Sequence, residues 1–307
     1  MSVIGLDTSN YTTSVAYFDG QSGVNCSQLL PVKQGELGLR QSDAVFHHTK
    51  SLPELSGRLF SHVQASEITA VAVSTRPRAV EGSYMPCFMV GYSHAKMLSD
   101  TLHVPLFEVS HQQGHVAASL WSAGRMDLMD EAHLAWHLSG GTTELLLVEP
   151  EGRNVKCTRI GGTTDISAGQ LIDRTGVMLG LPFPAGKHLD LLSREATGRE
   201  VFQVKCPEME FSLSGVQNKV QQFYNNGGSP EETAAYALRC VSYAVYKATE
   251  NARKRYPGLE VVFSGGVASN SMLRSLMEPM KPVFAQPQYS TDNAMGVAVL
   301  AHRLQEG

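Results

Sequence analysis

Two stretches of the chain share one pattern: an apolar strand, a short polar turn that ends in Thr-Thr, and a second apolar strand. They are VIGLDTSNYTTSVAYF at 3–18 and AHLAWHLSGGTTELLLVEP at 132–150. A repeated opening of this kind is typical of a duplicated architecture, in which each half begins with its own hairpin. Helical and strand periodicity follows each hairpin, so the repeat predicts an α/β protein with two lobes.

The 307 residues, 42% of them hydrophobic, are enough for two lobes with buried cores. In the first lobe we expect strands over 2–6, 13–18, 24–30, 68–74 and 104–110, and helices over 52–63 and 88–102. In the second we expect helices over 167–179 and 231–255, a strand over 260–266 and a helix from 269. We assign 1–120 to the N-terminal lobe and 131–291 to the C-terminal lobe, with a final helix over 292–304 that packs back on the first.

The net charge bears on whether the protein can bind nucleic acid, and the cysteines bear on the cellular compartment in which it is found. The net charge is −4, so an RNA partner would need a local basic patch or a helper protein. The five cysteines are scattered without a C-x-x-C pair, which indicates reduced thiols and no cysteine metal site. The sequence shows no signal peptide and no apolar run that could span a bilayer. We therefore expect a cytoplasmic protein without a membrane partner.

Two glycine turns are candidates for holding a nucleotide. In LSGGTTEL, residues 138–145, glycine backbone and hydroxyls can surround an anion, although an ordinary hairpin turn has the same composition. In FSGGVASN, residues 263–270, a strand runs through Gly-Gly into a helix whose first N–H groups would face a ligand; the alternative is a simple strand-to-helix turn. Neither is a P-loop. Together they suggest a nucleotide held in a cleft between lobes.

Three carboxylates, those of Asp165, Asp173 and Asp190, lie in one stretch of the chain, residues 165–190. Asp173 falls on a helical segment and Asp190 follows the turn PFPAG, where either could accept ribose hydroxyls or hold a metal. A solvated helix face or a helix cap is the alternative for each, and for Asp165 we adopt that alternative.

The stretch SHQQGHVAASL places His111 and His115 four residues apart. On a helix these residues share a face, so both imidazoles could reach one ion. A metalloprotease of the H-E-x-x-H type is excluded, because Gln112 stands where the general base belongs. From the residues alone, a metal pair and two surface or capping histidines both remain open.

Six motifs occur in the order and spacing of one family, and they cover nearly the whole chain. The chain resembles the tRNA threonylcarbamoyladenosine transferases, the TsaD or Gcp proteins once described as O-sialoglycoprotein endopeptidases. The motifs are SHQQGHVAASL, LSGGTTEL, AGQLIDRTGVMLGLPFPAG, FSLSGVQNKV, FSGGVASNSMLR and STDNAMGVAVLAHR. The resemblance implies the two-lobed fold of actin and the sugar kinases, the ASKHA ATPase fold, with duplicated subdomains and an interlobe cleft.

The resemblance also implies an activity, which is transfer of a threonylcarbamoyl group from its adenylate to the N6 amine of the adenosine next to the anticodon in ANN-decoding tRNA. The implied cofactors are one divalent metal ion, iron or zinc, and bound ATP, AMP or threonylcarbamoyl-adenylate. The implied partners are tRNA, a TsaB-like paralogue and the ATPase helper proteins of the pathway, in a homo- or heterodimer.

The site residues carry over motif by motif, and no catalytic residue is assigned beyond the metal site. The implied metal ligands are His111, His115 and Asp292. The implied nucleotide or substrate residues are His137, Leu138, Ser139, Gly140, Gly141, Asp173, Gly186, Asp190 and Asn270. A set of two histidines and one carboxylate accepts iron, zinc or manganese alike.

The chain departs from the family pattern at four places. Thr142 replaces the histidine of SGGHT, and Gln217 replaces the lysine of FSGLKT. Asn10-Tyr11-Thr12 stands where an acidic pair is usual, and 75–87 replaces a Gly-Pro-Gly loop. The histidine and lysine losses remove polar or charged groups close to where phosphates should lie, and the departures together indicate a divergent paralogue with altered or weakened chemistry.

Three functions follow from these observations. The intact metal ligands favour the enzyme, whereas the lost histidine and lysine favour a non-catalytic, nucleotide-binding member that scaffolds a tRNA-modification complex. A sugar kinase on the same fold comes last, because no aspartate base in a sugar-binding motif is identifiable.

Overall fold

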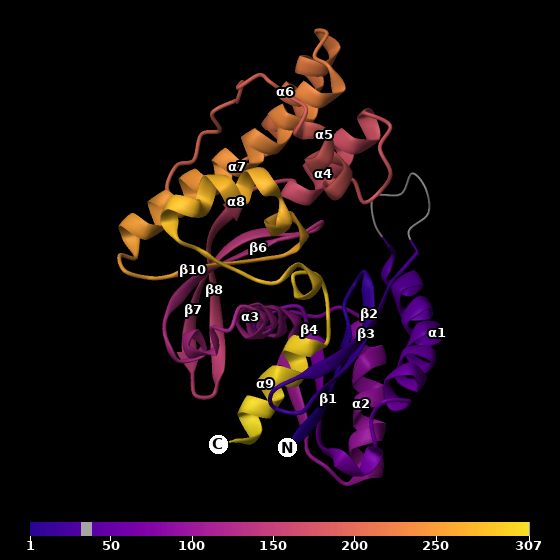
Figure 1. Cartoon of the computed structure of the whole chain (residues 1–307). Coiled ribbons are helices and arrows are strands. Elements are labelled where there is room, and N and C mark those ends of the chain that lie inside the picture. Colours follow the sequence, from indigo (N-terminus) through magenta and orange to yellow (C-terminus); the bar gives the residue numbers. More distant parts are fainter. Residues whose placement is uncertain (32–38, 307) are drawn as a thin grey trace. The chain divides into compact units, whose positions relative to one another are not determined.

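The computed structural model describes residues 1–31 and 39–306, and the chain divides into two compact units. The first unit contains the described residues of Met1–Glu131, Glu149–Cys157 and Asp292–Gly307, and the second contains Ala132–Val148 and Thr158–Thr291. Figure 1 colours the chain from its N-terminus to its C-terminus and shows the C-terminal helix beside the N-terminal strands of the first unit. The stretch Glu149–Cys157 belongs to the first unit although it is flanked by residues of the second.

The first unit is built on a sheet with the strand order β3-β2-β1-β4-β5. Strand β1 pairs antiparallel with β2 and parallel with β4, and β5 continues the parallel half of the sheet. The bounds are β1 Ser2–Thr8, β2 Thr12–Phe18, β3 Gly23–Leu29, β4 Ile68–Arg76 and β5 Leu106–Ser110.

The second unit repeats this topology. Its sheet has the order β11-β10-β6-β7-β8-β9, so β8-β7-β6-β10-β11 matches β3-β2-β1-β4-β5 strand for strand, and β9 is an addition at one edge. The hairpins match as well, because the closing pairs Thr8↔Thr13 and Leu138↔Thr143 each enclose four residues. The bounds are β6 His133–Leu138, β7 Thr143–Glu151, β8 Asn154–Thr163, β9 Glu210–Phe211, β10 Val261–Ser264 and β11 Val283–Phe284. The predicted duplication is confirmed.

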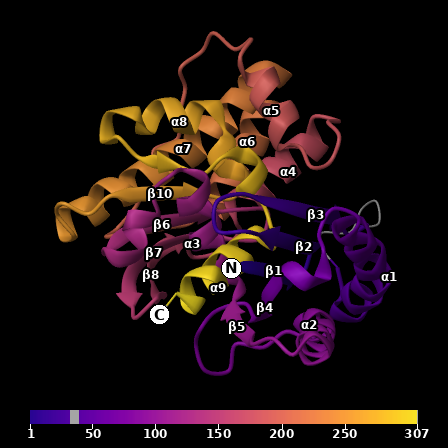
Figure 2. The ribbon, with the colours of Figure 1, turned by 60° about the horizontal axis from the view of Figure 1, so that its bottom comes forward.

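Helices cover both faces of the first sheet (Figures 1 and 2). Because side chains alternate along a strand, Ile4 and Leu6 pack in a core with Leu52, Leu55 and Leu59 of α1, while Gly5 faces α9. A Cβ at Gly5 would lie 2.6 Å from the carbonyl oxygen of Ala294, so the glycine lets α9 approach the sheet. The helices are α1 Gln41–Phe60, α2 Phe88–Leu102, α3 His111–Ser122 and α9 Met295–Gln305.

The core of the second unit lies between its sheet and the long helix α7. Leu134, Trp136 and Leu138 alternate along β6 and are buried there, and the Trp136 indole N–H donates to Thr249 Oγ1 of α7 at 2.8 Å. The helices are α4 Ala168–Met178, α5 Gly186–Ser193, α6 Ser214–Asn225, α7 Pro230–Arg255 and α8 Ser271–Met277. Short 3-10 turns occupy Ala65–Glu67, Met126–Asp130, Gly266–Ser269, Glu278–Met280 and Pro287–Tyr289.

Two helix predictions were wrong at their N-terminal ends. The helix expected over 52–63 begins at Gln41 and runs through Pro53. The helix expected from 292 begins at Met295, and the N–H of the preceding residue, Ala294, donates to Ser14 Oγ on β2. Among the described residues, no helix is both long and apolar enough to cross a membrane.

Candidate functional site

Helix α3 begins at His111 because the preceding residue caps it. Ser110 Oγ accepts a hydrogen bond from the Gln113 N–H at 3.2 Å, and Gln113 Oε1 accepts one from the Ser110 N–H at 2.9 Å. This capping box satisfies N–H groups that the helix itself leaves unpaired. His111 is therefore held in the first helical position, and His115 lies one turn later on the same face.

Asp292 reaches this face from the segment before α9, 177 residues after His115. The bond from the Ala294 N–H to Ser14 Oγ, at 2.8 Å, fixes the segment on β2. Helix α9 then crosses α3 closely at Gly296, where an added Cβ would overlap the carbonyl oxygen of Gly114 and lie 2.8 Å from Ala118 Cβ. The glycines set the distance between the helix that carries the histidines and the segment that carries the carboxylate.

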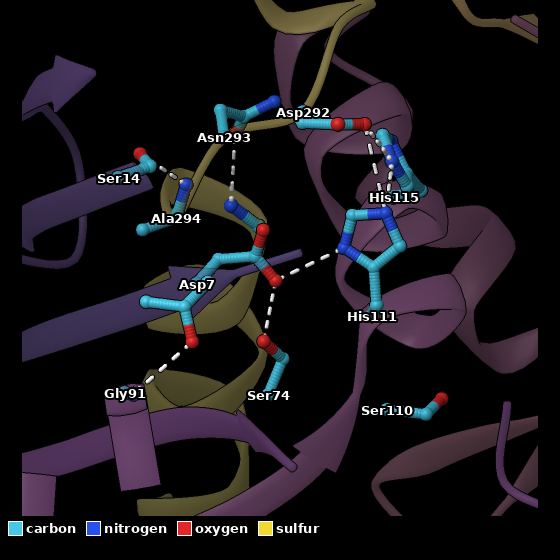
Figure 3. A network of polar contacts seen from close by, with 12 residues as sticks. Asp7, Ser14, Ser74, Gly91, Ser110, His111, His115, Asp292, Asn293 and Ala294 are labelled. Atoms are coloured by element: carbon cyan, nitrogen blue, oxygen red, sulfur yellow. Dashed lines mark hydrogen bonds and ion pairs between the residues drawn. The ribbon is translucent and has the colours of Figure 1, made fainter. Parts of the chain in front are cut away.

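The three side chains converge with the spacing of metal ligands (Figure 3). The Nε2 atoms of His111 and His115 are 3.0 Å apart, and Asp292 Oδ1 lies 3.1 Å from His115 Nε2 and 3.6 Å from His111 Nε2. Neighbouring ligand atoms around an ion with bonds of about 2.0–2.2 Å are about 3.0–3.5 Å apart. Within residues 1–31 and 39–306, no other group of three such side chains comes this close together. Two nitrogens and one oxygen suit a divalent ion that keeps open positions.

The charges around the three ligands favour a cation. Burial alone would lower the pKa of His111, but the carboxylates of Asp7 and Asp292 outweigh it and raise that pKa to about 10. Burial would raise the pKa of Asp292, yet its contacts with His111 and His115 hold that pKa well below the usual range. Both carboxylates therefore stay ionised, and a cation that binds here competes with the proton on His111.

Asp7 belongs to this site, and the sequence analysis missed it. It is fully buried at the end of β1, and its Oδ1 lies 2.9 Å from His111 Nδ1. Ser74 Oγ donates to the same oxygen. Burial would raise the pKa of Asp7, but His111 and Ser74 together lower it below its usual value. The available signal was an acidic residue directly before the polar turn of the first hairpin.

The two glycine turns lie together in the second unit, at the carboxyl ends of the neighbouring parallel strands β6 and β10. Gly265 has φ 89°, and a Cβ there would overlap the Leu138 carbonyl oxygen, so the turns are in direct contact. Ser167 Oγ, at the start of α4, donates to the Gly140 carbonyl at 2.6 Å. A Cβ at Gly140 or Gly141 would meet nothing within 4 Å. The carboxyl ends of adjacent parallel strands are where ligands bind in open α/β sheets.

Asp190 and Asn270 lie together beside these turns. Asp190 Oδ1 accepts hydrogen bonds from Asn270 Nδ2 at 2.7 Å and from the Ser271 N–H at 2.9 Å. Asn270 Oδ1 also accepts from the Leu273 N–H at 3.0 Å and so caps α8. These contacts hold the start of α8 against α5. The Asp190 and Asn270 side chains are thus hydrogen-bonded to other groups of the protein.

Asp173 and Gly186 lie together at the join of α4 and α5. Asp173 Oδ1 accepts from the Ala185 N–H at 2.8 Å, and burial raises the pKa of this half-buried carboxyl. Gly186 is the first residue of α5, and Asp190 lies one turn further along. His137 lies in β6, paired with Glu144 on β7 and with Ser264 on β10. The second unit therefore contains all nine predicted nucleotide residues, whereas the metal ligands belong to the first.

Comparison with known proteins decides the family. The family model described as TsaD, tRNA N6-adenosine threonylcarbamoyltransferase, matches residues 33–299. The chain belongs to the TsaD family. A relative from Sulfurihydrogenibium sp., named tRNA N6-adenosine threonylcarbamoyltransferase, is 31% identical over 99% of this chain and 90% of its own length. The resemblance seen in the motifs is thus confirmed, and the protein is an enzyme of the transferase class whose family-level function is tRNA threonylcarbamoyl transfer.

Solved structures with the same fold confirm the ASKHA architecture. Full-length HypF, in a phosphate- and nucleotide-bound form, superposes with a TM-score of 0.63 at 16% identity, over 100% of this chain and 47% of that one. The ROK hexokinase from Thermus thermophilus superposes with a TM-score of 0.50 at 14% identity, over 100% of both chains. At these identities the likeness concerns the fold alone.

Proposed function

We propose that the protein transfers a threonylcarbamoyl group from threonylcarbamoyl-adenylate to the N6 amine of the adenosine next to the anticodon in ANN-decoding tRNA, and that the transfer depends on a divalent metal. The observation that carries the proposal is the convergence of His111, His115 and Asp292 within 3.6 Å of one another. Two histidines and a carboxylate at this spacing form a ligand set typical of divalent transition-metal sites.

The reaction forms a bond between N6 and the carbamoyl carbon and breaks the bond between that carbon and the phosphate oxygen. AMP leaves, and the amine gives up one proton. His111, His115 and Asp292 would hold a divalent ion. When bound, the ion would supply Lewis acidity toward the oxygens of the donor. The first turn of α3 and the segment before α9 keep the three ligands in place.

The second unit supplies the groups that would hold the nucleotide. The turn at Gly140 and Gly141, where an added Cβ would meet nothing within 4 Å, leaves backbone groups open to a phosphate. Asp173 of α4 accepts a hydrogen bond from Ala185, the residue before α5, and a carboxylate there could also accept ribose hydroxyls. Asp190 and Asn270 act as supports, because their mutual hydrogen bond fixes the start of α8.

One observation favours the second candidate, a nucleotide-binding scaffold of a tRNA-modification complex. Gln217 replaces an ammonium group of the family motif, and its Oε1 accepts a hydrogen bond from Arg174 Nη1 at 2.8 Å. The ammonium group of the family motif is therefore absent at position 217, where the glutamine binds a neighbouring arginine instead, and this loss is expected of a member that no longer carries out transfer.

A reconstituted transfer assay separates the two candidates. The metal-loaded protein is mixed with threonylcarbamoyl-adenylate, unmodified ANN-decoding tRNA and the candidate TsaB-like and ATPase partners, and the nucleosides are read by mass spectrometry. We expect modified adenosine with the parent and a rate at least about 100-fold lower with Asp292→Ala, since Lewis-acid stabilisation is worth several kcal/mol. The control Asp100→Ala removes an exposed carboxylate of α2 paired with Lys96 and should change nothing. No product beside an active control enzyme would support the scaffold.

A further inference from the structure

Asp7 is a buried carboxylate whose contacts with other side chains all involve one of its two oxygens. Its side chain is 0% exposed, and its Oδ1 lies 2.9 Å from His111 Nδ1 and receives the Ser74 hydroxyl hydrogen bond. Among the residues that the structure describes, Oδ2 has no hydrogen-bond partner. Burying a carboxylate with one oxygen unpaired costs free energy. Folding alone would not favour an aspartate at this position. We therefore look for its role in the hydrogen bond that it makes with His111.

The second unit shows that the fold does not require this carboxylate. In the duplicated sheet, the position of Asp7 is taken by His137, one residue before the closing pair of the hairpin. The position of Ser74 is taken by Ser264, the strand partner of His137. Ser264 Oγ donates to the Trp136 carbonyl at 2.9 Å, so this serine is satisfied by backbone alone. The contact between a carboxylate at a strand end and a serine is thus found in the first unit, which contains His111 and His115, and not at the equivalent position of the second.

A neutral imidazole carries its proton on only one nitrogen, and a metal binds the other. A carboxylate accepts hydrogen bonds and cannot donate one, so Asp7 holds the proton of His111 on Nδ1. Nε2, the atom that faces His115 and Asp292, is then left with its lone pair. Figure 3 shows the His111 ring between Asp7 on one side and the His115–Asp292 pair on the other.

We propose that Asp7, held by Ser74, is a positioning residue that selects the metal-binding tautomer of His111 and thereby sets the affinity of the site for its ion. The inference rests on the proposed metal-dependent function. It assigns no contact with substrate to Asp7, and it concerns only the strength and orientation of the His111 ligand. Carboxylates that orient a metal-bound histidine in this way typically contribute 10–100-fold in metal affinity.

The test is the dissociation constant for Co²⁺, read from its visible absorption spectrum in competition with a chelator. Asp7→Asn keeps the shape of the side chain but loses the charge and can turn its amide to donate. We expect its dissociation constant to rise about 10–100-fold and the Co²⁺ spectrum to change. Ser74→Ala should weaken binding in the same direction by less, and Ser264→Ala, the matched serine of the second unit, should bind as the parent does.

A second measurement does not depend on any variant folding. Nitrogen NMR of the zinc-loaded parent, with labelled histidine, reports which nitrogen of His111 carries the proton, and we expect Nδ1. A proton on Nε2, or an Asp7→Asn variant that folds and binds Co²⁺ as tightly as the parent, overturns the role of Asp7 and leaves the proposed function standing. A parent that binds no Co²⁺ overturns the metal dependence itself.

Discussion

Gly296→Ala tests whether the crossing of α3 and α9 positions the metal ligands. The added Cβ would overlap the Gly114 carbonyl oxygen and lie 2.8 Å from both the backbone nitrogen and the Cβ of Ala118. Since a carbon needs about 3.5 Å from such atoms, α9 must shift by about 1 Å or more. The obstacles are mostly backbone atoms that cannot rotate away, and Asp292 lies only four residues before the altered position.

The size of the effect follows from two opposing contributions. Overpacking costs about 1–3 kcal/mol, and replacing a helical glycine by alanine returns up to about 1 kcal/mol. With rigid neighbours the cost lies at its upper end, so we expect a net loss of about 2 kcal/mol and an unfolding midpoint about 4–8 °C lower. The shift also opens the spacing of 3.1 Å between Asp292 Oδ1 and His115 Nε2, so Co²⁺ affinity should fall as well.

Gly57→Ala is the matched control, since Gly57 lies in α1 and an added Cβ there would meet nothing within 4 Å. This variant should be as stable as the parent or more stable by up to about 1 kcal/mol, with unchanged Co²⁺ affinity. The assays are thermal unfolding in chelator and a Co²⁺ titration. If Gly296→Ala unfolds with the parent and binds Co²⁺ equally well, the close crossing does not position the ligands.

Three further predictions concern stability. Ser110→Ala removes the α3 cap and should lower the free energy of unfolding by about 1 kcal/mol in denaturant titrations; an unchanged midpoint would contradict the capping role. Thr249→Val leaves the buried Trp136 indole N–H without its 2.8 Å partner and should cost about 1–2 kcal/mol, whereas a neutral change would show that this bond contributes nothing. Burial alone would raise the pKa of Asp165. Hydrogen bonds from Ser212 and from the start of α6 outweigh this effect, and the net result is a pKa of about 2. The parent should therefore lose about 1 kcal/mol, reduced by solvent screening, as the pH falls from about 4 to 2, and Asp165→Asn should lack this part of the pH dependence.

The sequence predicted those helices and strands whose apolar residues recur at regular helical or strand spacing along the whole element. Apolar residues follow a regular spacing in the two hairpins and in α2. The structure places α2 at Phe88–Leu102, as expected. Helix α1 was found only in part because its first half buries little besides Ala44 and His48, so the apolar signal begins at Leu52. His48 is buried for a tertiary reason, a 2.8 Å contact with Thr13 Oγ1, which no local pattern shows.

For the site, too, local spacing could be predicted from the sequence, whereas contacts between distant parts of the chain could not. The spacing of His111 and His115 places both on one helical face, and this follows from local geometry. Asp292 came from the family motif alone, because no spacing rule relates residues 177 positions apart. Asp7 was missed because its bond to His111 joins β1 to α3 across 104 residues and depends on strand order. The contact between the two glycine turns depends in the same way on β6 and β10 being neighbours.

The most direct test of the central claim is the amount of metal bound per chain. Parent protein and a His115→Ala variant are reconstituted with Fe²⁺ or Zn²⁺ without oxygen, freed of excess ion, and measured by mass spectrometry of the metal. His62→Ala, at an exposed position, is the control. We predict one ion per chain in the parent and the control and close to none in His115→Ala. Equal metal content in the parent and His115→Ala would contradict the metal centre and the function built on it.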